Sequence, residues 1–271
     1  MRIEVAESIS DFKPADWNAL TGGQHACLTH EFLSASEDTR SASAETGWQP
    51  RHLGLMDKNG RLIAAMPLYE KSHSWGEFVF DWGWAHAYEQ AGLDYYPKLV
   101  SAIPFTPATS RRLLTDDPEH QLLLAEAARE IAVAEGFSSV HVLFPEGDEL
   151  PILESAGMRP RKDCQFHWHN AGYANFDAFL ATFSSAKRKK ARRDRRHVAE
   201  QQITFRRIAG ADADDAIWRD VYELISITFL RRGSMPYFTR EFFVEVSNRL
   251  SDNILIVLAE KAGAPIAAAV F

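Results

Sequence analysis

The sequence is poor in cysteine and has no long uncharged apolar run. Its 271 residues include two cysteines, Cys27 and Cys164, which lie far apart and show no CxxC or Cys/His ligand spacing. This pattern supports neither a disulfide framework nor a zinc module. No stretch reaches the roughly 18–20 apolar residues that a membrane helix requires, and the first residues lack the apolar segment of a signal peptide. We therefore expect a cytoplasmic protein without a transmembrane segment.

Motifs of several common protein classes are also missing. The sequence contains no GxSxG, HExxH, Walker or GxGxxG pattern, which leaves hydrolase, protease, NTPase and Rossmann interpretations without support. It also contains no RNP, KH or zinc-finger pattern, so sequence-specific DNA or RNA recognition is not expected.

The sequence does contain an alternation of strand-like and helix-like segments, which predicts an α/β protein with a mixed sheet, a type that some schemes class as α+β. Its hydrophobic content of 46% is enough for an ordinary core. In the first half, extended segments are expected at 2–6, 51–56, 61–69, 77–84, 96–107, 138–144 and 164–169, with helices at 15–20, 30–39, 118–134 and 149–156. In the second half, a helix is expected from 176 into a basic run, with strands at 203–208, 254–260 and 265–271 and helices at 213–230 and 239–250.

Two predicted hairpins resemble each other at a constant offset of 203 residues. The segment KNGRLIAA at 58–65 aligns with KAGAPIAA at 261–268. Hairpins with a glycine turn also look alike without a common origin, but helix-rich segments precede both hairpins and favour a duplication. We expect a first domain over residues 1–170 and a second over residues 171–271. Because the second domain would end directly after its hairpin, we expect the chain to be part of a longer protein.

The predicted order of elements resembles a known fold. A strand, two helices, a hairpin, a further strand, a long helix and another strand resemble the acetyltransferase (GNAT) fold. The tandem arrangement, with a basic helix opening the second half, resembles the Fem-type peptidoglycan aminoacyltransferases. Several phrases are similar to the proteobacterial FemAB-like family: TGWQPRHLGL (46–55), PLYEKSHSWGEFVFDWGWAHAY (67–88), YYPKLVSAIPFTP (95–107), SSVHVLFP (138–145), CQFHWHN (164–170) and GSMPYFTREFF (233–243).

This resemblance implies tandem GNAT-like folds, the second of them truncated, and an acyl or aminoacyl transferase. The acceptor would be an amine, with a peptidoglycan precursor as the candidate. Fem-type members use aminoacyl-tRNA as donor, and acyl-coenzyme A is the rival donor. No other cofactor is implied.

A glycine-rich phosphate loop is missing from the first half. Ordinary GNAT enzymes hold the coenzyme A pyrophosphate on such a loop, because backbone N–H groups must approach the phosphates closely. The corresponding segment, TPATSRRLLTDDPE, has no glycine and contains Asp116 and Asp117, which would repel a pyrophosphate. We therefore expect no coenzyme A site in the first half.

Positive charge is concentrated between Lys187 and His197, where eight Lys or Arg stand with one acid in a chain of net charge −7. On a helix these side chains form adjacent stripes. A stripe of this kind attracts tRNA phosphates, a nucleotide-linked cell-wall precursor or an acidic patch of the protein itself. The alternative is a solvated surface helix. The candidate anion-binding residues are Arg188, Lys189, Arg192, Arg193 and Arg196.

The segment that begins at Lys71 mixes titratable and aromatic side chains, which suits an apolar cleft with a few placed polar groups. The candidate substrate-binding residues here are Lys71, Trp82 and Trp84. On the predicted strand, Asp81 would point away from the aromatic face and, near Lys71 or His73, act as a general base for an amine. His73 is the second catalytic candidate. The alternative is a structural Asp81 that is hydrogen-bonded to backbone or indole groups.

Three further residues are candidates for a substrate cleft: Gln165, His167 and Tyr237. His167 and His169 would share one face of the strand 164–169, but two ligands without a companion are too few for a metal, so no metal site is predicted. His141 is expected to be a core histidine, and Tyr237 has simple packing as its alternative. A non-catalytic module that binds an anionic or peptidoglycan-like ligand is the rival to the transferase.

Overall fold

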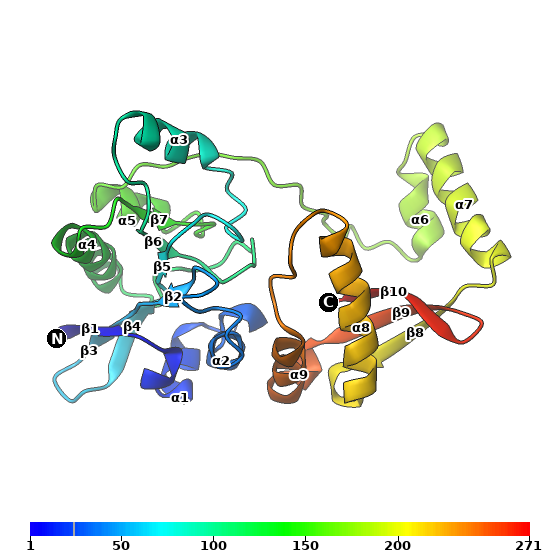
Figure 1. The fold of residues 1–271 in the computed structure, drawn as a ribbon, viewed down its shortest axis with the longest axis horizontal. Helices are drawn as coiled ribbons and strands as arrows, with labels where there is room; N and C mark the ends of the chain where they lie inside the picture. Colours follow the sequence, from blue (N-terminus) through cyan, green and yellow to red (C-terminus); the bar gives the residue numbers. More distant parts are fainter. Residues whose placement is uncertain (24) are drawn as a thin grey trace. The chain divides into compact units, whose positions relative to one another are not determined.

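The computed structural model describes residues 1–23 and 25–271. The chain divides into two compact units (Figure 1). Unit 1 comprises Met1–Arg161 and Pro236–Ser251, and unit 2 comprises Lys162–Met235 and Asp252–Phe271. Both units combine helices with β-sheets, so the predicted mixed α/β class is confirmed. Among the described helices, none combines the length and the apolar character that crossing a bilayer requires.

Unit 1 begins with a three-stranded antiparallel sheet in the order β1-β3-β4. Its elements are β1 (Arg2–Ala6), α1 (Pro14–Leu20), α2 (His30–Asp38), β3 (His52–Met56) and β4 (Leu62–Met66), with 3₁₀ turns at Ile9–Asp11 and Ala26–Leu28. Helix α2 begins where the sequence predicts, because the Thr29 hydroxyl accepts a hydrogen bond from the Phe32 N–H and so satisfies one of the free donors of the first turn.

A second sheet of unit 1 has the order β2-β5-β6-β7. Its strands are β2 (Gln49–Pro50), β5 (Tyr69–Lys71), β6 (Lys98–Ser101) and β7 (Val140–Val142). Strands β6 and β7 are parallel, and the long helix α4 (Pro118–Glu135) joins them, followed after β7 by α5 (Leu150–Ser155). The second arm of the first predicted hairpin is divided between β4 and β5, because Pro67 has no N–H to donate to a continuous ladder.

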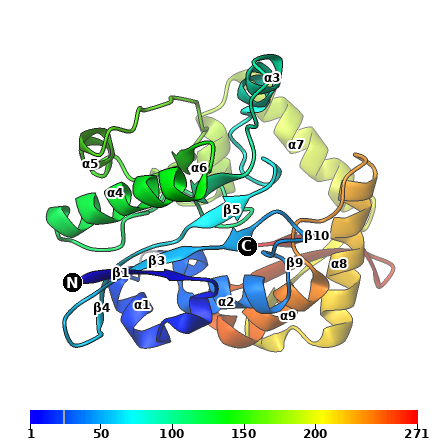
Figure 2. The ribbon, with the colours of Figure 1, turned by 60° about the vertical axis from the view of Figure 1, so that its left-hand side comes forward.

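The core of unit 1 lies between the sheets and helix α4. Figure 2 shows α4 on one side of the strands and α1 on the other. Buried leucines of β3 and β6, such as Leu53 and Leu99, pack with Leu124 and Ala128 of α4. The helix buries a stripe of small and leucine side chains at helical spacing, as the sequence predicts.

Helix α9 (Arg240–Arg249) belongs to unit 1. Its N-terminus is capped by Thr239, whose hydroxyl accepts from the Phe242 N–H. The helix packs on α2, where the Phe32 and Phe242 rings lie 5.2 Å apart and Arg249 pairs with Asp38 at 2.9 Å. The predicted cap of this helix is therefore confirmed.

Unit 2 contains a three-stranded antiparallel sheet in the order β10-β9-β8. Its elements are α6 (Phe176–Ala181), α7 (Ser185–Glu200), β8 (Thr204–Ala209), α8 (Asp215–Leu230), β9 (Leu255–Lys261) and β10 (Ala264–Val270), with a 3₁₀ turn at Gly210–Asp212. A further 3₁₀ turn, Ser251–Asn253, begins at the last residue of unit 1. Helix α8 packs against β10. The predicted continuous helix from 176 into the basic run is wrong: it is two helices, and the chain breaks after Ala181.

The first strand pair of each sheet has the same register. Arg2 pairs with Met56 in β1 and β3, and Phe205 pairs with Ala259 in β8 and β9, so that both residue numbers rise by 203. The next four pairs follow the same offset, down to Ala6 with His52 and Ala209 with Leu255. Because one slip in register would move every side chain to the other face, this agreement extends the similarity of the two segments from their turns to their strand pairing.

Two predicted strands are wrong. Residues 77–84 form an irregular loop that leads into helix α3 (Trp82–Gln90), because Phe78 and Phe80 have φ of 61° and 48°, which a strand cannot contain. Residues 164–169 form neither helix nor strand in the described chain and are exposed; Phe166 is 98% exposed. Alternating polarity predicts a strand only where a neighbouring strand is available to complete the ladder.

Candidate functional site

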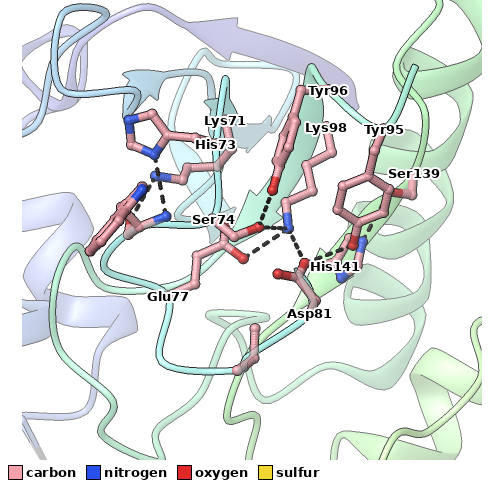
Figure 3. A network of polar contacts seen from close by, with 12 residues as sticks. Lys71, His73, Ser74, Glu77, Asp81, Tyr95, Tyr96, Lys98, Ser139 and His141 are labelled. Atoms are coloured by element: carbon pink, nitrogen blue, oxygen red, sulfur yellow. Dashed lines mark hydrogen bonds and ion pairs between the residues drawn. The ribbon is translucent and has the colours of Figure 1, made fainter. Parts of the chain in front are cut away.

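A buried network of charged side chains forms around Lys98 of β6 (Figure 3). Its ammonium group donates to Ser74 Oγ at 2.9 Å, Glu77 Oε2 at 2.9 Å and Asp81 Oδ2 at 2.5 Å. The Tyr95 hydroxyl donates to the same Asp81 oxygen at 2.7 Å. The Lys98, Glu77 and Asp81 side chains are fully buried. One ammonium group therefore fixes three positions of the irregular loop between β5 and α3.

The network sets the charges of its members. Burial raises the pKa of Asp81, but hydrogen bonds from Lys98 and Tyr95 outweigh it and bring that pKa down to about 2. Burial raises the pKa of Glu77, and the charge of Lys98 offsets this only in part. The pKa of Tyr95 is raised by burial and by its bond to Asp81. The phenol is therefore neutral and the Asp81 carboxylate is ionised at neutral pH.

Lys71 of β5 is a second fully buried lysine. Its ammonium group lies 3.6 Å from the centre of the Trp48 ring and donates to the Trp75 carbonyl at 3.3 Å. Burial lowers the pKa of Lys71 to about 7, although the charges of Glu77 and Asp81 oppose that shift. The charge of Lys71 therefore changes near physiological pH.

His73 lies beside Lys71 and is half-buried. Its Nδ1 accepts a hydrogen bond from the Trp75 N–H at 3.2 Å. Burial, with a further contribution from Lys71, lowers the pKa of His73 below its ordinary value. The imidazole is therefore neutral at neutral pH, and the lone pair of Nδ1 is already used.

An aromatic pocket of about 430 Å³ lies beside the network. It is lined by Ser74, Trp75, Gly76, Phe78, Phe80, Trp82 and Tyr237. The rings of Trp75 and Trp82 lie 5.8 Å apart, edge to face, and those of Phe78 and Tyr237 lie 5.7 Å apart. Ser74 connects the pocket with the network, because its hydroxyl accepts a hydrogen bond from the Lys98 ammonium group at 2.9 Å and also contacts the Tyr96 hydroxyl at 2.8 Å. The pocket is open to solvent, and most of its accessible lining is apolar.

The backbone around this pocket is strained. Among the described residues, four of the seven non-glycine residues with positive φ are phenylalanines: Phe78, Phe80, Phe105 and Phe144. The first two line the pocket, and Phe105 stacks on Tyr237 at 5.2 Å. A bulky residue in this conformation costs about 1–3 kcal/mol. Strain of this kind concentrates at ligand and active sites, so the pocket is the candidate functional site of unit 1.

His141 lies at the far side of the network. Its Nε2 contacts Ser139 Oγ at 2.9 Å, and its ring packs edge-on against Tyr95 at 6.2 Å. Burial lowers its pKa to about 4. His141 is half-buried, so it lies at the margin of the core.

The basic helix α7 presents its charge to solvent. Among the predicted anion-binding residues, Arg188 is half-buried and the others are exposed: Lys189, Arg192, Arg193 and Arg196. Arg192 pairs with Asp177 at 3.2 Å and Arg193 with Asp194 at 3.3 Å. Within the described residues, no ion pair forms at Lys189 or Arg196. Helix α7 therefore carries positive charge that the surrounding unit leaves largely unbalanced.

The structure divides the predicted site residues between the two units. Unit 1 holds Asp81, His73, Lys71, Trp82, Trp84 and Tyr237, and unit 2 holds Gln165, His167 and the basic helix. Trp82 and Tyr237 line the aromatic pocket, whereas Trp84 is exposed on α3 and does not. Gln165 Oε1 contacts His167 Nε2 at 3.1 Å on an exposed segment.

Sequence reasoning placed Asp81 near Lys71 or His73 and missed its actual partner. The ion pair is with Lys98, and this favours the structural alternative for Asp81. Glu77, Ser74 and Tyr95 were missed as well. A usable signal was present, because Lys98 is the single charge in the apolar run YYPKLVSAI, and a charge in a buried strand requires a partner.

The next question is whether the described residues could hold a metal ion, or the N-terminus of α4 a pyrophosphate. The described residues contain no group of three or more His, Cys, Asp or Glu side chains that could hold a metal ion. At the N-terminus of α4, Asp117 caps the helix by accepting from the Glu119 N–H at 2.9 Å, and Asp116 pairs with Arg111. Carboxylates thus occupy the helix end where a phosphate would bind.

These features define a mixed α/β protein with three sheets and an aromatic pocket beside a buried charged network. The chain belongs to the FemAB_like family, described as peptidoglycan biosynthesis/recognition, whose model matches residues 8–271. A comparison with curated proteins found no match. Among solved structures, the crystal structure of FemX is similar at 16% identity and a TM-score of 0.48. That match covers 96% of this chain, which spans 57% of the length of the FemX chain.

Proposed function

We propose that the protein is a Fem-type acyl or aminoacyl transferase that acts on an amine acceptor, with a peptidoglycan precursor as the acceptor class. Membership of the FemAB_like family over residues 8–271 is the observation that carries this proposal. In the reaction, the amine nitrogen attacks the carbonyl carbon of an activated ester. A C–N bond forms, the C–O bond breaks, the nitrogen loses a proton and the departing oxygen gains one.

The order of elements supports a tandem GNAT-like arrangement. Unit 1 follows the expected order, with β1, two helices, the β3–β4 hairpin, β6, α4 and a parallel β7. The strand β8, two helices and the β9–β10 hairpin repeat the start of that order in the same register. We propose that residues 1–170 and 171–271 derive from two copies of one ancestral unit.

Aminoacyl-tRNA is the donor that the surface charge favours. Helix α7 exposes basic side chains that lack acidic partners of comparable number, and such a surface attracts phosphates. Acyl-coenzyme A is disfavoured in unit 1, because Asp116 and Asp117 lie at the start of α4. An acyl-coenzyme A reaction remains the second candidate only for a site outside unit 1.

The pocket and its network would serve binding and orientation. Holding two reactants in place supplies much of the rate in reactions of this type. Trp82 and Tyr237 line the pocket, and Ser74 is the pocket residue that also belongs to the network. Asp81 is a weak base because Lys98 and Tyr95 hold its charge, so its role is to position the loop.

The donor is tested by titrating the protein with a mixed aminoacyl-tRNA pool and, separately, with acetyl-coenzyme A at several salt concentrations. We expect tRNA binding that weakens steeply with salt and is reduced in the triple variant R188A/R192A/R196A. Coenzyme A binding that the triple variant leaves unchanged would move the chemistry away from α7. Binding of neither donor would contradict the transferase and favour a module that only binds a peptidoglycan-like ligand.

A further inference from the structure

The walls of the aromatic pocket of unit 1 are unusually exposed. Phe80 is 73% exposed, Trp75 is 53% exposed and Trp82 is 46% exposed. Large aromatic side chains stabilise a fold mainly when they are buried, and these three are held in the open by a strained loop. Their ring faces are electron-rich surfaces that attract cations. The walls are therefore suited to a cationic ligand that contacts several rings at once.

Next to Ser74, the buried network contains two carboxylate oxygens, Glu77 Oε1 and Asp81 Oδ1, that have no hydrogen-bond donor among the described residues. Ser74 lines the pocket, and its neighbours on the Lys98 ammonium group are the carboxylates of Glu77 and Asp81. Glu77 lies in the chain between Gly76 and Phe78, which both line the pocket. Its Oε1 atom is buried and has no hydrogen-bond partner among the described residues. A buried carboxylate oxygen of this kind requires a donor.

The charges around the pocket leave a negative balance. Two carboxylates, Glu77 and Asp81, face one paired ammonium group, that of Lys98. Burial lowers the pKa of Lys71 to about 7, so it loses its charge above that pH. The Arg161 guanidinium is a further cation nearby, and it donates to the Val79 carbonyl at 2.8 Å from an exposed position. Solvent screens this exposed charge far more than it screens the buried carboxylates.

We propose that the aromatic pocket of unit 1 binds a primary ammonium group, with the ring faces of Trp75, Phe80 and Trp82 around it. This inference rests on the proposed function, because it assigns the pocket to the amine acceptor before that amine loses its proton. The carboxylates of Glu77 and Asp81 in the neighbouring network favour a cation over an uncharged sugar ring. Ammonium groups are bound in proteins by aromatic walls of this kind.

The test is calorimetric titration of the full chain at pH 8 with cadaverine, a five-carbon diamine, and with 1-pentanol, an uncharged alcohol with the same number of carbons. We expect cadaverine to bind at least about fivefold more tightly than 1-pentanol, as the attraction of one ammonium group to aromatic faces predicts. The variant W82L should weaken cadaverine binding at least about fivefold.

A matched pair of phenylalanine variants controls for general effects. F80L removes a pocket ring, whereas F205L removes a ring of similar exposure on β8, 73% against 62%. We expect weaker cadaverine binding in F80L and unchanged binding in F205L. Equal binding of cadaverine and 1-pentanol, equal losses in F80L and F205L, or binding of N-acetylglucosamine in place of cadaverine would each overturn the proposal.

These outcomes are separable from those of the proposed function. Cadaverine binding without any transfer of an aminoacyl group would keep the ammonium site and contradict the transferase. Transfer by a protein that does not discriminate cadaverine from 1-pentanol would keep the transferase and contradict the ammonium site.

Discussion

The molecule contains two clusters of charged side chains that differ in burial, in the sign of their charges and in pairing. Around Lys98, charges of both signs are sealed in unit 1 and held by short hydrogen bonds. Along α7, charges of one sign stand in solvent with few partners. In a low-dielectric interior a charge must be paired or it destabilises the fold, whereas at the surface water and salt screen it. The first cluster therefore determines local structure, and the second is available for a partner.

The largest effect on stability is expected from removing Lys98 from the buried network. K98M leaves Glu77 and Asp81 buried without a cation, which costs about 3–5 kcal/mol of unfolding free energy. Urea unfolding, followed by far-UV circular dichroism, measures this loss. R193A, which removes one member of an exposed pair, should change the unfolding free energy by less than about 0.5 kcal/mol. Comparable losses in both variants would contradict the comparison.

A second contrast uses two glycines with positive φ. Gly76 has φ of 81° and lies against the Phe105 ring, so a methyl group added there would clash; Gly60 has φ of 76° and open space around it. Both alanine variants are strained, but G76A also overpacks the pocket wall. We expect G76A to lose about 1–3 kcal/mol more than G60A, measured as the difference in urea midpoints at equal slopes. An equal loss of stability in G76A and G60A would show that the Phe105 ring moves aside at little cost.

A third prediction concerns pH and Lys71. Its pKa falls from the ordinary value of 10.5 to about 7 in the folded protein. Between these values the unfolded chain binds more protons, so the contribution of Lys71 makes stability rise with pH, by up to about 1.4 kcal/mol per pH unit. Urea unfolding at pH 7.5, 8.5 and 9.5 should show this rise in the wild type and a smaller one in K71M. The same slope in both proteins would mean that Lys71 keeps its proton.

The smallest effect on stability is expected at α7. The triple variant R188A/R192A/R196A removes exposed or half-buried charges, each within about 0.5 kcal/mol of neutral. Its effect should appear in tRNA binding, where each lost phosphate contact lowers the slope against log salt by roughly 0.7–0.9. A stability loss as large as that of K98M would make α7 a structural element and not a binding surface.

Local signals predicted much of the fold. Thr29 and Thr239 mark helix starts through caps that involve residues only three positions away, and the periodicity of 118–134 identifies α4 because it depends on one helix face. The repeat of the hairpins was also visible in the sequence. Its exact register was not, because register depends on which strands pair.

The candidate site was predicted only in part. The aromatic density of 75–84 drew attention to the right segment, but it predicted a strand where the backbone is an irregular loop. The positive φ of Phe78 and Phe80 has no signal in the sequence, since bulky residues rarely adopt it. Lys98 lies 17 to 24 residues from the groups it binds, so its partners became known only from the tertiary structure.

The comparison of the two charge clusters is tested most directly by paired double-mutant cycles of unfolding free energy. One cycle combines K98M with D81N and probes the buried ion pair between Lys98 and Asp81. The other combines R193A with D194A and probes an exposed ion pair of the same chain. We predict a coupling energy above about 1 kcal/mol for the buried pair and below about 0.5 kcal/mol for the exposed pair. Equal coupling energies in the two cycles would contradict the account.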